Sequence, residues 1–200
     1  MSPRSKEMAE LMRGKSREAI LGASLELFAK RGYSATTTEE IARLAGISKG
    51  LIFNHFGTKQ DILLAIFDEQ FERIMPRFFQ DSDSRPAKER LLTLIDAWLA
   101  FIKTDPLLVR LSLHLNLDDE YRKLLKNKKT ISYFENFITQ MTTMLKEAGS
   151  DRPQLDTYVL MFMFDGIVAN YTVAPELFPI DAIKDHLVDM IVSRWNKSGD

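Results

Sequence analysis

The chain has 200 residues, enough for one large domain or for a small domain joined to a larger one. Hydrophobic residues make up 45% of it and charged residues 28%, as in ordinary globular proteins, and the absence of cysteine excludes a disulfide framework and a thiolate metal site. No signal peptide and no run of eighteen apolar residues is evident, so the sequence predicts a cytoplasmic protein without a membrane span.

Charge is distributed unevenly along the chain. Residues 1–60 carry ten Lys and Arg against six Glu, whereas the rest of the chain carries seventeen Lys and Arg against twenty-two Asp and Glu. The net charge of −1 therefore averages over a basic N-terminal region and an acidic remainder. This asymmetry is typical of a DNA-binding head joined to a larger sensor.

Apolar residues recur at helical spacing through most of the chain, and no segment predicts a strand. The first helix is predicted near residues 17–30, with Gly32 ending it. A Thr-x-x-Glu capping box, Thr37 with Glu40, then starts a short helix that ends at Ala45. The basic segment before the first helix, residues 4–15, is predicted to be a solvated tail, and contact with a DNA minor groove is the alternative.

The next signals are again helix ends. Gly46 turns the chain, Ser48 caps a third helix, Gly57 closes it, and a fourth helix runs from near Lys59 to a kink or end at Pro76. The polar, breaker-rich segment 80–85 is predicted to be a linker-like loop. Further helices are predicted over residues 86–103, 105–117, 118–148, 151–174 and 181–196. The predicted fold is all-α with about nine helices.

The segment from Thr38 to Gly57 has the spacing of a helix-turn-helix unit. Two helices that meet through a tight turn need a small residue where they cross, which Ala42 supplies, and a residue that tolerates positive φ, which is Gly46. Ile52 follows Ala42 by ten residues and can fill the gap between the two helices. This pattern is typical of a DNA-reading pair of helices.

On a helical wheel the third helix has one inward face, with Ile52 and Phe56, and one outward face. The outward face is predicted to consist of Lys49, Gly50, Leu51, Phe53 and Asn54. Asn can pair with adenine, Lys can donate to guanine, and apolar groups can pack on a thymine methyl. Residues at the neighbouring helix ends can hold phosphates; these are Thr37, Ser48, His55 and Lys59.

The run GYSATTTEEIARLAGISKGLIFNHFGTKQDIL resembles the N-terminal domain of the TetR family of bacterial regulators. The matching positions are Gly32, Tyr33, Thr37, Ile41, Ala42, Ala45, Gly46, Ile47, Ser48, Gly50, His55, Phe56, Lys59, Ile62 and Leu63. The resemblance covers roughly residues 15–65. It implies that Thr37, Lys49, His55 and Lys59 hold phosphates and that the face from Gly50 to Asn54 meets bases.

Two residues depart from the family pattern. Phe53 stands where the family commonly has Tyr, so a hydroxyl that could bond a phosphate is missing. Leu51 stands where a smaller or more polar residue is usual, which could shift recognition toward thymine methyls. Both departures bear on which DNA sequence is read.

The remainder of the chain resembles the family in length and helical character. We expect residues 1–60 to form the helix-turn-helix domain and residues 61–200 to form a helical ligand-binding and dimerisation domain. Methionines and aromatic residues concentrate in the second region, and such side chains can line an adaptable apolar site. The predicted ligand-binding residues are Trp98, Phe101, His114, Phe134, Phe137, Met141, Met161 and Asp165; Asn170 and Tyr171 are further polar groups on apolar faces.

The last two predicted helices are apolar on more than one side, which requires a partner for the second stripe. A twofold four-helix interface would supply one and resembles the usual family dimer. The predicted interface residues are Val159, Phe162, Gly166, Val173, Ile183, Leu187 and Ile191.

The resemblance thus predicts a homodimeric regulator, a repressor that a small, largely apolar effector releases from a double-stranded DNA operator. No cofactor and no metal site is predicted. Two other classes remain open, a helical enzyme or carrier and a pure protein-interaction bundle. No phosphate-binding GxxxxGK, GxSxG or HExxH motif occurs, and the three histidines lie far apart.

Overall fold

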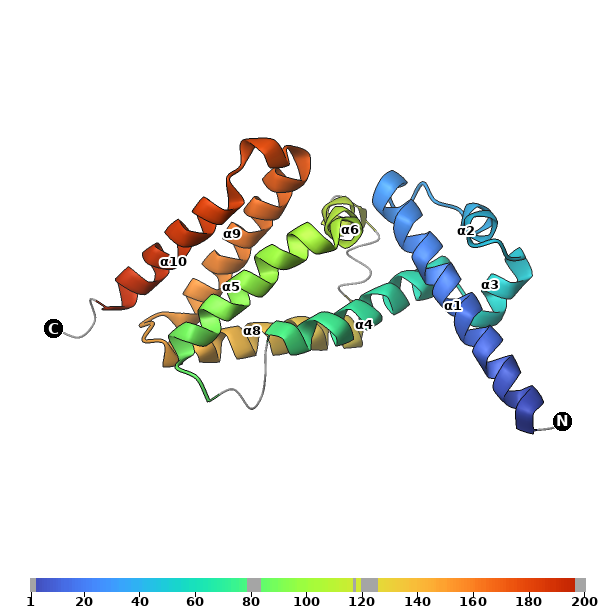
Figure 1. The fold of residues 1–200 in the computed structure, drawn as a ribbon, viewed down its shortest axis with the longest axis horizontal. Coiled ribbons are helices and arrows are strands. Elements are labelled where there is room, and N and C mark those ends of the chain that lie inside the picture. The colour runs from blue at the N-terminus through green and yellow to red at the C-terminus, as the bar shows by residue number, and fades with distance from the viewer. Residues whose placement is uncertain (1–2, 79–83, 117, 120–125, 197–200) are drawn as a thin grey trace. The chain divides into compact units, whose positions relative to one another are not determined.

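The computed structural model describes residues 3–78, 84–116, 118–119 and 126–196 (Figure 1). Nine α-helices, one 3₁₀ turn and no strand lie in these ranges, which confirms the predicted all-α class. The elements are α1 (Pro3–Arg31), α2 (Thr38–Ala45), α3 (Lys49–His55), α4 (Lys59–Phe78), α5 (Ala87–Thr104), α6 (Pro106–Asn116), α8 (Lys128–Glu147), α9 (Pro153–Val173), η1 (Pro175–Leu177) and α10 (Ile180–Asn196). No helix in the described ranges is both long and apolar enough to cross a membrane.

The first helix differs from the prediction. The expected tail over residues 4–15 is helical, because α1 is one continuous helix of 29 residues from Pro3. Pro3 stands in the first helical position, where its missing N–H costs no hydrogen bond, and the residues after it are mostly strong helix formers. Residues 5–15 are all exposed.

The long helix predicted from Asp118 to Ala148 is also wrong at its start. The helix that reaches Glu147 begins at Lys128, because the Asn127 side chain accepts hydrogen bonds from the N–H groups of Lys129 and Thr130 and caps it. Residues 120–125 lie outside the described ranges, as does most of the predicted loop 80–85. Pro76 lies in the last described turn of α4.

Contacts divide the chain into two compact units. One unit contains residues 1–71 and 110–124, and the other contains residues 72–109 and 125–200. The second half of α6 therefore belongs with α1, α2 and α3, although it is distant from them in sequence. The domain boundary predicted at residue 60 stays a prediction.

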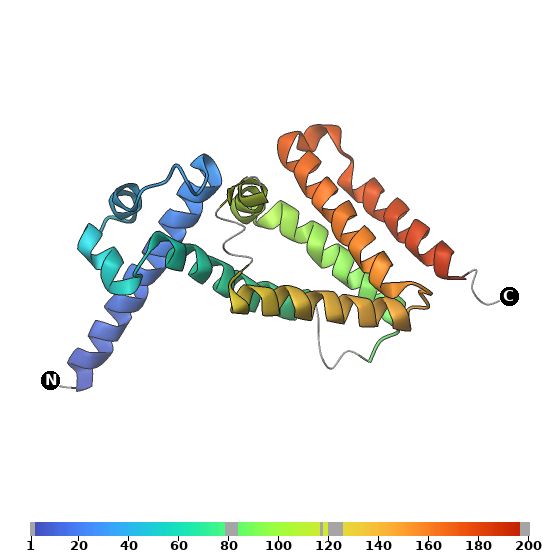
Figure 2. The same ribbon diagram turned by 180° about the vertical axis from the view of Figure 1, so that it is seen from behind.

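In the first unit α1 packs against α2 and α2 against α3. Its core contains side chains that are almost fully buried: Ile20, Phe28, Ile41, Ile52, Ile62 and Leu63. Figure 2 shows this group of blue and cyan helices from behind. α1 ends before Gly32, which has a φ of 84°. The ring centres of Phe28 and Tyr33, which precede and follow Gly32 in the sequence, lie 5.2 Å apart.

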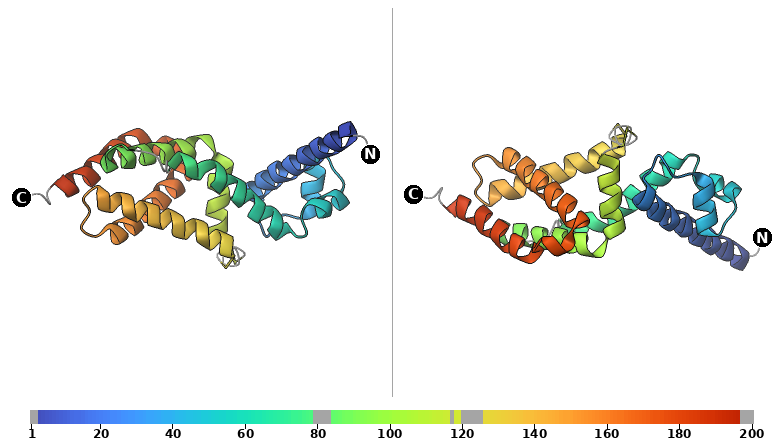
Figure 3. Two further views of the ribbon diagram at one scale, coloured as in Figure 1. Left: turned by 90° about the horizontal axis from the view of Figure 1, so that it is seen from below. Right: turned by 90° about the horizontal axis from the view of Figure 1, so that it is seen from above.

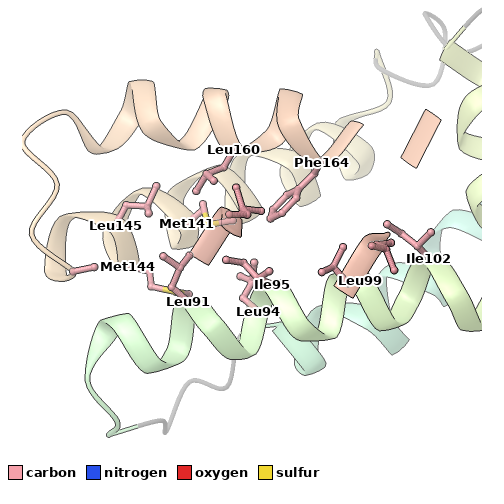
Figure 4. Close-up of a cluster of buried hydrophobic side chains, with 13 residues drawn as sticks. Leu91, Leu94, Ile95, Leu99, Ile102, Met141, Met144, Leu145, Leu160 and Phe164 are labelled. Atoms are coloured by element: carbon pink, nitrogen blue, oxygen red, sulfur yellow. The ribbon is translucent and has the colours of Figure 1, made fainter. Parts of the chain in front are cut away.

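In the second unit α5 packs against α8 and α10, and α8 packs against α9 (Figure 3). The core is a cluster of aliphatic, methionine and aromatic side chains from these four helices (Figure 4). Leu91, Leu94 and Ile95 contribute from α5, Met141 and Leu145 from α8. Such a core holds α9 and α10 in place, with some of their apolar side chains inside it and others outside.

Candidate nucleic-acid interface

The turn between α2 and α3 has the geometry that the sequence predicts. Gly46 adopts φ 69° and ψ 30°, in the left-handed region that favours glycine. The N–H of Ile47 donates to the carbonyl of Ala42 at 3.0 Å, so the turn also satisfies a carbonyl at the end of α2. The two helices are therefore joined at a fixed angle through three residues.

Both helices begin at side-chain caps. The Thr37 hydroxyl accepts from the N–H of Glu40, and the Glu40 carboxylate accepts from the N–H of Thr37 at 3.0 Å, which completes the predicted capping box. The hydrogen bonds that the Glu40 carboxylate accepts from the N–H and from the hydroxyl of Thr37 lower the pKa of Glu40. The Ser48 hydroxyl accepts from the N–H of Leu51 at 3.3 Å at the start of α3. Thr37 and Ser48 are exposed.

One side of α3 is anchored in the core. Ile52 is 1% exposed and Phe56 is 7% exposed, and the buried Ile41 and Ala42 lie on α2, which packs against α3. The helix ends at His55 with Phe56 as its cap, one residue earlier than the predicted stop at Gly57. This anchoring fixes which side of α3 faces outward.

The outward side carries the residues that the wheel predicts. Lys49, Gly50, Phe53 and Asn54 are exposed, and Leu51 is half-buried. A Cβ at Gly50 would meet no atom within 4 Å, so packing inside the free protein does not require glycine there. The structure thus brings a cation, an amide, an aromatic ring and an open glycine to one exposed face.

The Lys49 ammonium has two partners on this face. It pairs with the Glu39 carboxylate on α2, and it lies 5.9 Å from the centre of the Phe53 ring, one turn along α3. The hydrogen bond from Lys49 lowers the pKa of Glu39. Sequence reasoning missed Glu39, because no periodicity relates a residue early in α2 to a residue ten positions later across a turn.

Two arginines of α1 influence the end of α3. Arg13 and Arg17 lower the pKa of His55, although burial of the imidazole is the larger cause. Arg17 also pairs with Glu69 of α4, and its guanidinium carbon lies 5.6 Å from the centre of the Phe56 ring. The sequence prediction counted both arginines only in the charge of the region, and it began the first helix near residue 17, too late to include Arg13.

Lys59 has hydrogen-bond partners within its own unit. Its ammonium donates to the carbonyls of Tyr33 and Thr36, both at 2.8 Å, and lies 4.2 Å from the centre of the Tyr33 ring. The charge therefore stabilises the loop between α1 and α2. The assignment of Lys59 to a phosphate stays a prediction.

The predicted ligand-binding residues are distributed over both units. Trp98 stacks on Phe164 with ring centres 4.2 Å apart, and Phe137 and Met141 pack in the same core. Phe101, Phe134 and Met161 are half-buried in the second unit. Asp165 is exposed there, and partial desolvation of its carboxyl raises its pKa. His114 lies apart from them, because it is exposed and belongs to the first unit, beside Gly32.

A groove of about 510 Å³ lies between α9 and α10. Met163, Ile167 and Ile183 are among the apolar residues that line it, and Asn170, Tyr171 and His186 supply polar groups. None of the eight predicted ligand-binding residues lines this groove. Asn170 and Tyr171, the two further polar groups noted in the sequence, do line it. The groove itself was not predicted, because it forms only where α9 and α10 come together in the fold.

The predicted interface stripe on α9 is exposed. Val159 is 50%, Phe162 71% and Val173 83% exposed, and Gly166 is exposed on the same side. Ile183 is half-buried, whereas Leu187 is buried in the core of its own unit and so does not face outward as predicted. Ile191 lies on α10 at a position whose side chain is outside the described part.

Comparison with known proteins adds to this geometry. The family profile described as bacterial regulatory proteins, tetR family, matches residues 20–66. The chain is 24% identical to the fatty acid metabolism regulator protein of Bacillus subtilis over 87% of its own length and 92% of that protein. It is 48% identical to the HTH-type transcriptional regulator QacR of Staphylococcus aureus over 26% of the chain and 28% of QacR.

The fold is similar to that of solved regulators. The structure of the transcriptional regulator FadR from Bacillus subtilis in complex with stearoyl-CoA matches with a TM-score of 0.74 at 23% identity, covering 88% of this chain and 97% of that one. The QacR match has the higher identity and spans only about a quarter of the chain, whereas the weaker matches extend over nearly all of it. The family profile covers the helix-turn-helix region, whereas the longer matches extend over nearly all of the chain.

Proposed function

The chain is a DNA-binding transcriptional regulator of the TetR family, and from this premise we propose that it is a homodimeric repressor which a small, largely apolar effector releases from its operator. The observation that carries the proposal is the exposed face of α3, fixed outward by Ile52 and Phe56 in the core. The matched relatives are named as regulators, and we assign the chain no catalytic role. A protein that reads an operator works in the compartment of the DNA, which in a bacterium is the cytoplasm.

On this proposal the outward face of α3, called the reading face and made of Lys49, Gly50, Leu51, Phe53 and Asn54, makes the base contacts. Lys49 and Asn54 have the donor and acceptor groups for guanine and adenine, and Gly50 leaves room for close approach of the backbone. Leu51 and Phe53 can pack on thymine methyl groups. Thr37, Ser48 and His55, at the neighbouring helix ends, are assigned to phosphates.

The proposed dimer uses the exposed stripe of α9 together with α10. Val159, Phe162 and Val173 form an apolar surface that a monomer would leave in water. A twofold axis through this surface would pair it with its own copy. Two reading helices would then meet successive major grooves about 34 Å apart, one turn of DNA.

The DNA-binding claim is tested by titrating the protein with a random-sequence duplex at several salt concentrations. We expect the logarithm of the affinity to fall linearly with the logarithm of the salt concentration, because bound lysines and arginines release counterions from the phosphates. A duplex selected from a random library should bind more tightly. Absence of binding even at low salt, with or without effector, would overturn the proposal.

The effector class is tested with the ligand of a solved neighbour. FadR from Bacillus subtilis is described in complex with stearoyl-CoA, and the second unit of this chain has an apolar core and groove. We expect stearoyl-CoA to weaken binding to the selected duplex and coenzyme A, which lacks the acyl chain, to have no effect. Equal effects of the two would show that the chain does not recognise an apolar group.

A further inference from the structure

The Lys49 side chain is restrained on two sides in the free protein. A lysine has three N–H donors on a flexible four-carbon stem and ordinarily moves freely at a surface. Here the ammonium is paired with the Glu39 carboxylate and lies 5.9 Å from the centre of the Phe53 ring, close enough for a cation–π attraction. A single pair of this kind is weak, but both partners restrict the same ammonium.

The partners come from different elements. Glu39 lies in the first turn of α2, where an acidic residue is favoured by the helix dipole, and its carboxylate also receives the Thr38 hydroxyl at 3.2 Å. Phe53 lies four residues after Lys49 on α3, at the position where sequence analysis identifies a departure from the family pattern. The packing of α2 against α3 therefore decides where the ammonium lies.

We infer that Glu39 is a positioning residue which, with the Phe53 ring, holds the Lys49 ammonium at the reading face, so that its other donors meet a base edge and not the nearest phosphate. This inference rests on the proposed DNA-binding function and names a determinant of its specificity. A lysine that can reach any phosphate increases affinity for all sequences, whereas a lysine held toward the groove increases affinity only for sequences with guanine at that position. The negative charge of Glu39 also keeps the pair neutral toward the DNA backbone.

The test compares Glu39→Gln with Glu26→Gln as a matched control. Glu26 forms an exposed ion pair with Lys30 at 2.7 Å on α1, so both variants remove one carboxylate from an exposed pair in the same unit. Affinities are measured for a random-sequence duplex and for a duplex selected with the wild-type protein, at several salt concentrations. Thermal unfolding checks that each variant folds.

We expect Glu39→Gln to bind the random duplex about two- to fivefold more tightly, the range that an exposed ion pair can supply, with a salt slope steeper by about one. Binding to the selected duplex should change by less, so the selectivity ratio falls. Glu26→Gln should keep the wild-type ratio. In a Lys49→Met background, Glu39→Gln should no longer change the ratio, because there is no ammonium to position.

Other results overturn the inference. An unchanged or higher ratio in Glu39→Gln would mean that the pair is a competitor broken by DNA or has no part in recognition. An equal fall of the selectivity ratio in the Lys49→Met background would mean that Glu39 acts on selectivity without Lys49. Failure of the wild-type protein to bind any duplex is a different result, since it overturns the DNA-binding function itself.

Discussion

At the scale of single residues, glycine geometry separates positions that look alike in the sequence. Gly46 has φ 69°, which costs a residue with a Cβ about 1–2 kcal/mol. Gly22 lies inside α1, has ordinary helical geometry, and a Cβ there would meet no atom within 4 Å. Both positions are exposed, so solvent contact does not distinguish them.

We therefore expect Gly46→Ala to lower the free energy of unfolding by about 1–2 kcal/mol and Gly22→Ala to raise it by about 0.5–1 kcal/mol. Urea unfolding of the two variants beside the wild type measures both changes. Equal effects at the two positions would contradict the role given to the left-handed turn.

His55 gives the fold a pH dependence of known sign. Burial and the nearby Arg13 and Arg17 lower its pKa in the folded state. As the pH falls below the ordinary histidine pKa of about 6.5, the unfolded chain takes up a proton before the folded one does, so stability falls. The loss begins near that pH and is complete below the lowered pKa.

We expect the wild-type protein to lose more unfolding free energy between pH 8 and pH 5.5 than His55→Gln does, because the variant has no imidazole to protonate. His114 and His186 are exposed and are present in both proteins, so the difference isolates His55. Identical pH profiles would show that the environment of His55 does not favour the neutral form.

At the scale of elements, α2 depends on one side chain at its start. The helix has only eight residues, and Thr37 satisfies one of its free N–H groups in the capping box. The adjacent Thr38 is the first residue of the helix, and its hydroxyl reaches only the carboxylate of Glu39 among the hydrogen bonds described. The two threonines are therefore a matched pair for measuring the cap.

Thr37→Ala should lower the free energy of unfolding by about 1 kcal/mol, the usual cost of losing such a cap. Thr38→Ala should change it by less than about 0.5 kcal/mol. Calorimetric unfolding of both variants provides the measurement. A Thr38 variant as unstable as the Thr37 variant would argue against the capping box.

The elements that the sequence predicts well are those with local signals at their ends. Thr37, Gly46 and Ser48 act within four residues of the backbone groups that they satisfy, so α2 and α3 are predicted almost to the residue. The start of α8 was missed because Asp118 and Asn127 are both plausible caps, and periodicity does not choose between them. A residue that can cap a helix allows a helix to begin there but does not require it.

The candidate site also has one part that local sequence signals predict and one part that they do not. Which residues of α3 face outward follows from helical period, and the exposed Lys49, Gly50, Phe53 and Asn54 agree with it. What they contact does not follow, because the Glu39 partner and the groove between α9 and α10 arise from the packing of separate helices.

At the scale of the whole molecule, the proposed dimer depends on the exposed surface of α9. Phe162 is 71% exposed at the middle of the proposed interface, so a charge there would be buried against its own copy. Leu11, 54% exposed on α1, offers an exposed apolar residue in the other unit as a control.

Phe162→Lys should raise the dimer dissociation constant by about tenfold or more, whereas Leu11→Lys should leave it unchanged. Sedimentation velocity over a range of micromolar concentrations measures both. A wild-type monomer throughout that range would remove the interface from the proposal, and loss of the dimer in Leu11→Lys would move it to α1.

The length of α1 has a consequence for motion. Its residues 20–29 are largely buried in the first unit, whereas residues 5–15 are all exposed, and a largely exposed helical segment of that length is marginal in water. The two parts of this continuous helix should therefore differ in amide hydrogen exchange. Amide protons before Gly14 should exchange with deuterium quickly through fraying, and those from Ile20 onward should exchange only when the unit opens. The N-terminal third is helical on average and would be free to reshape against whatever surface it meets.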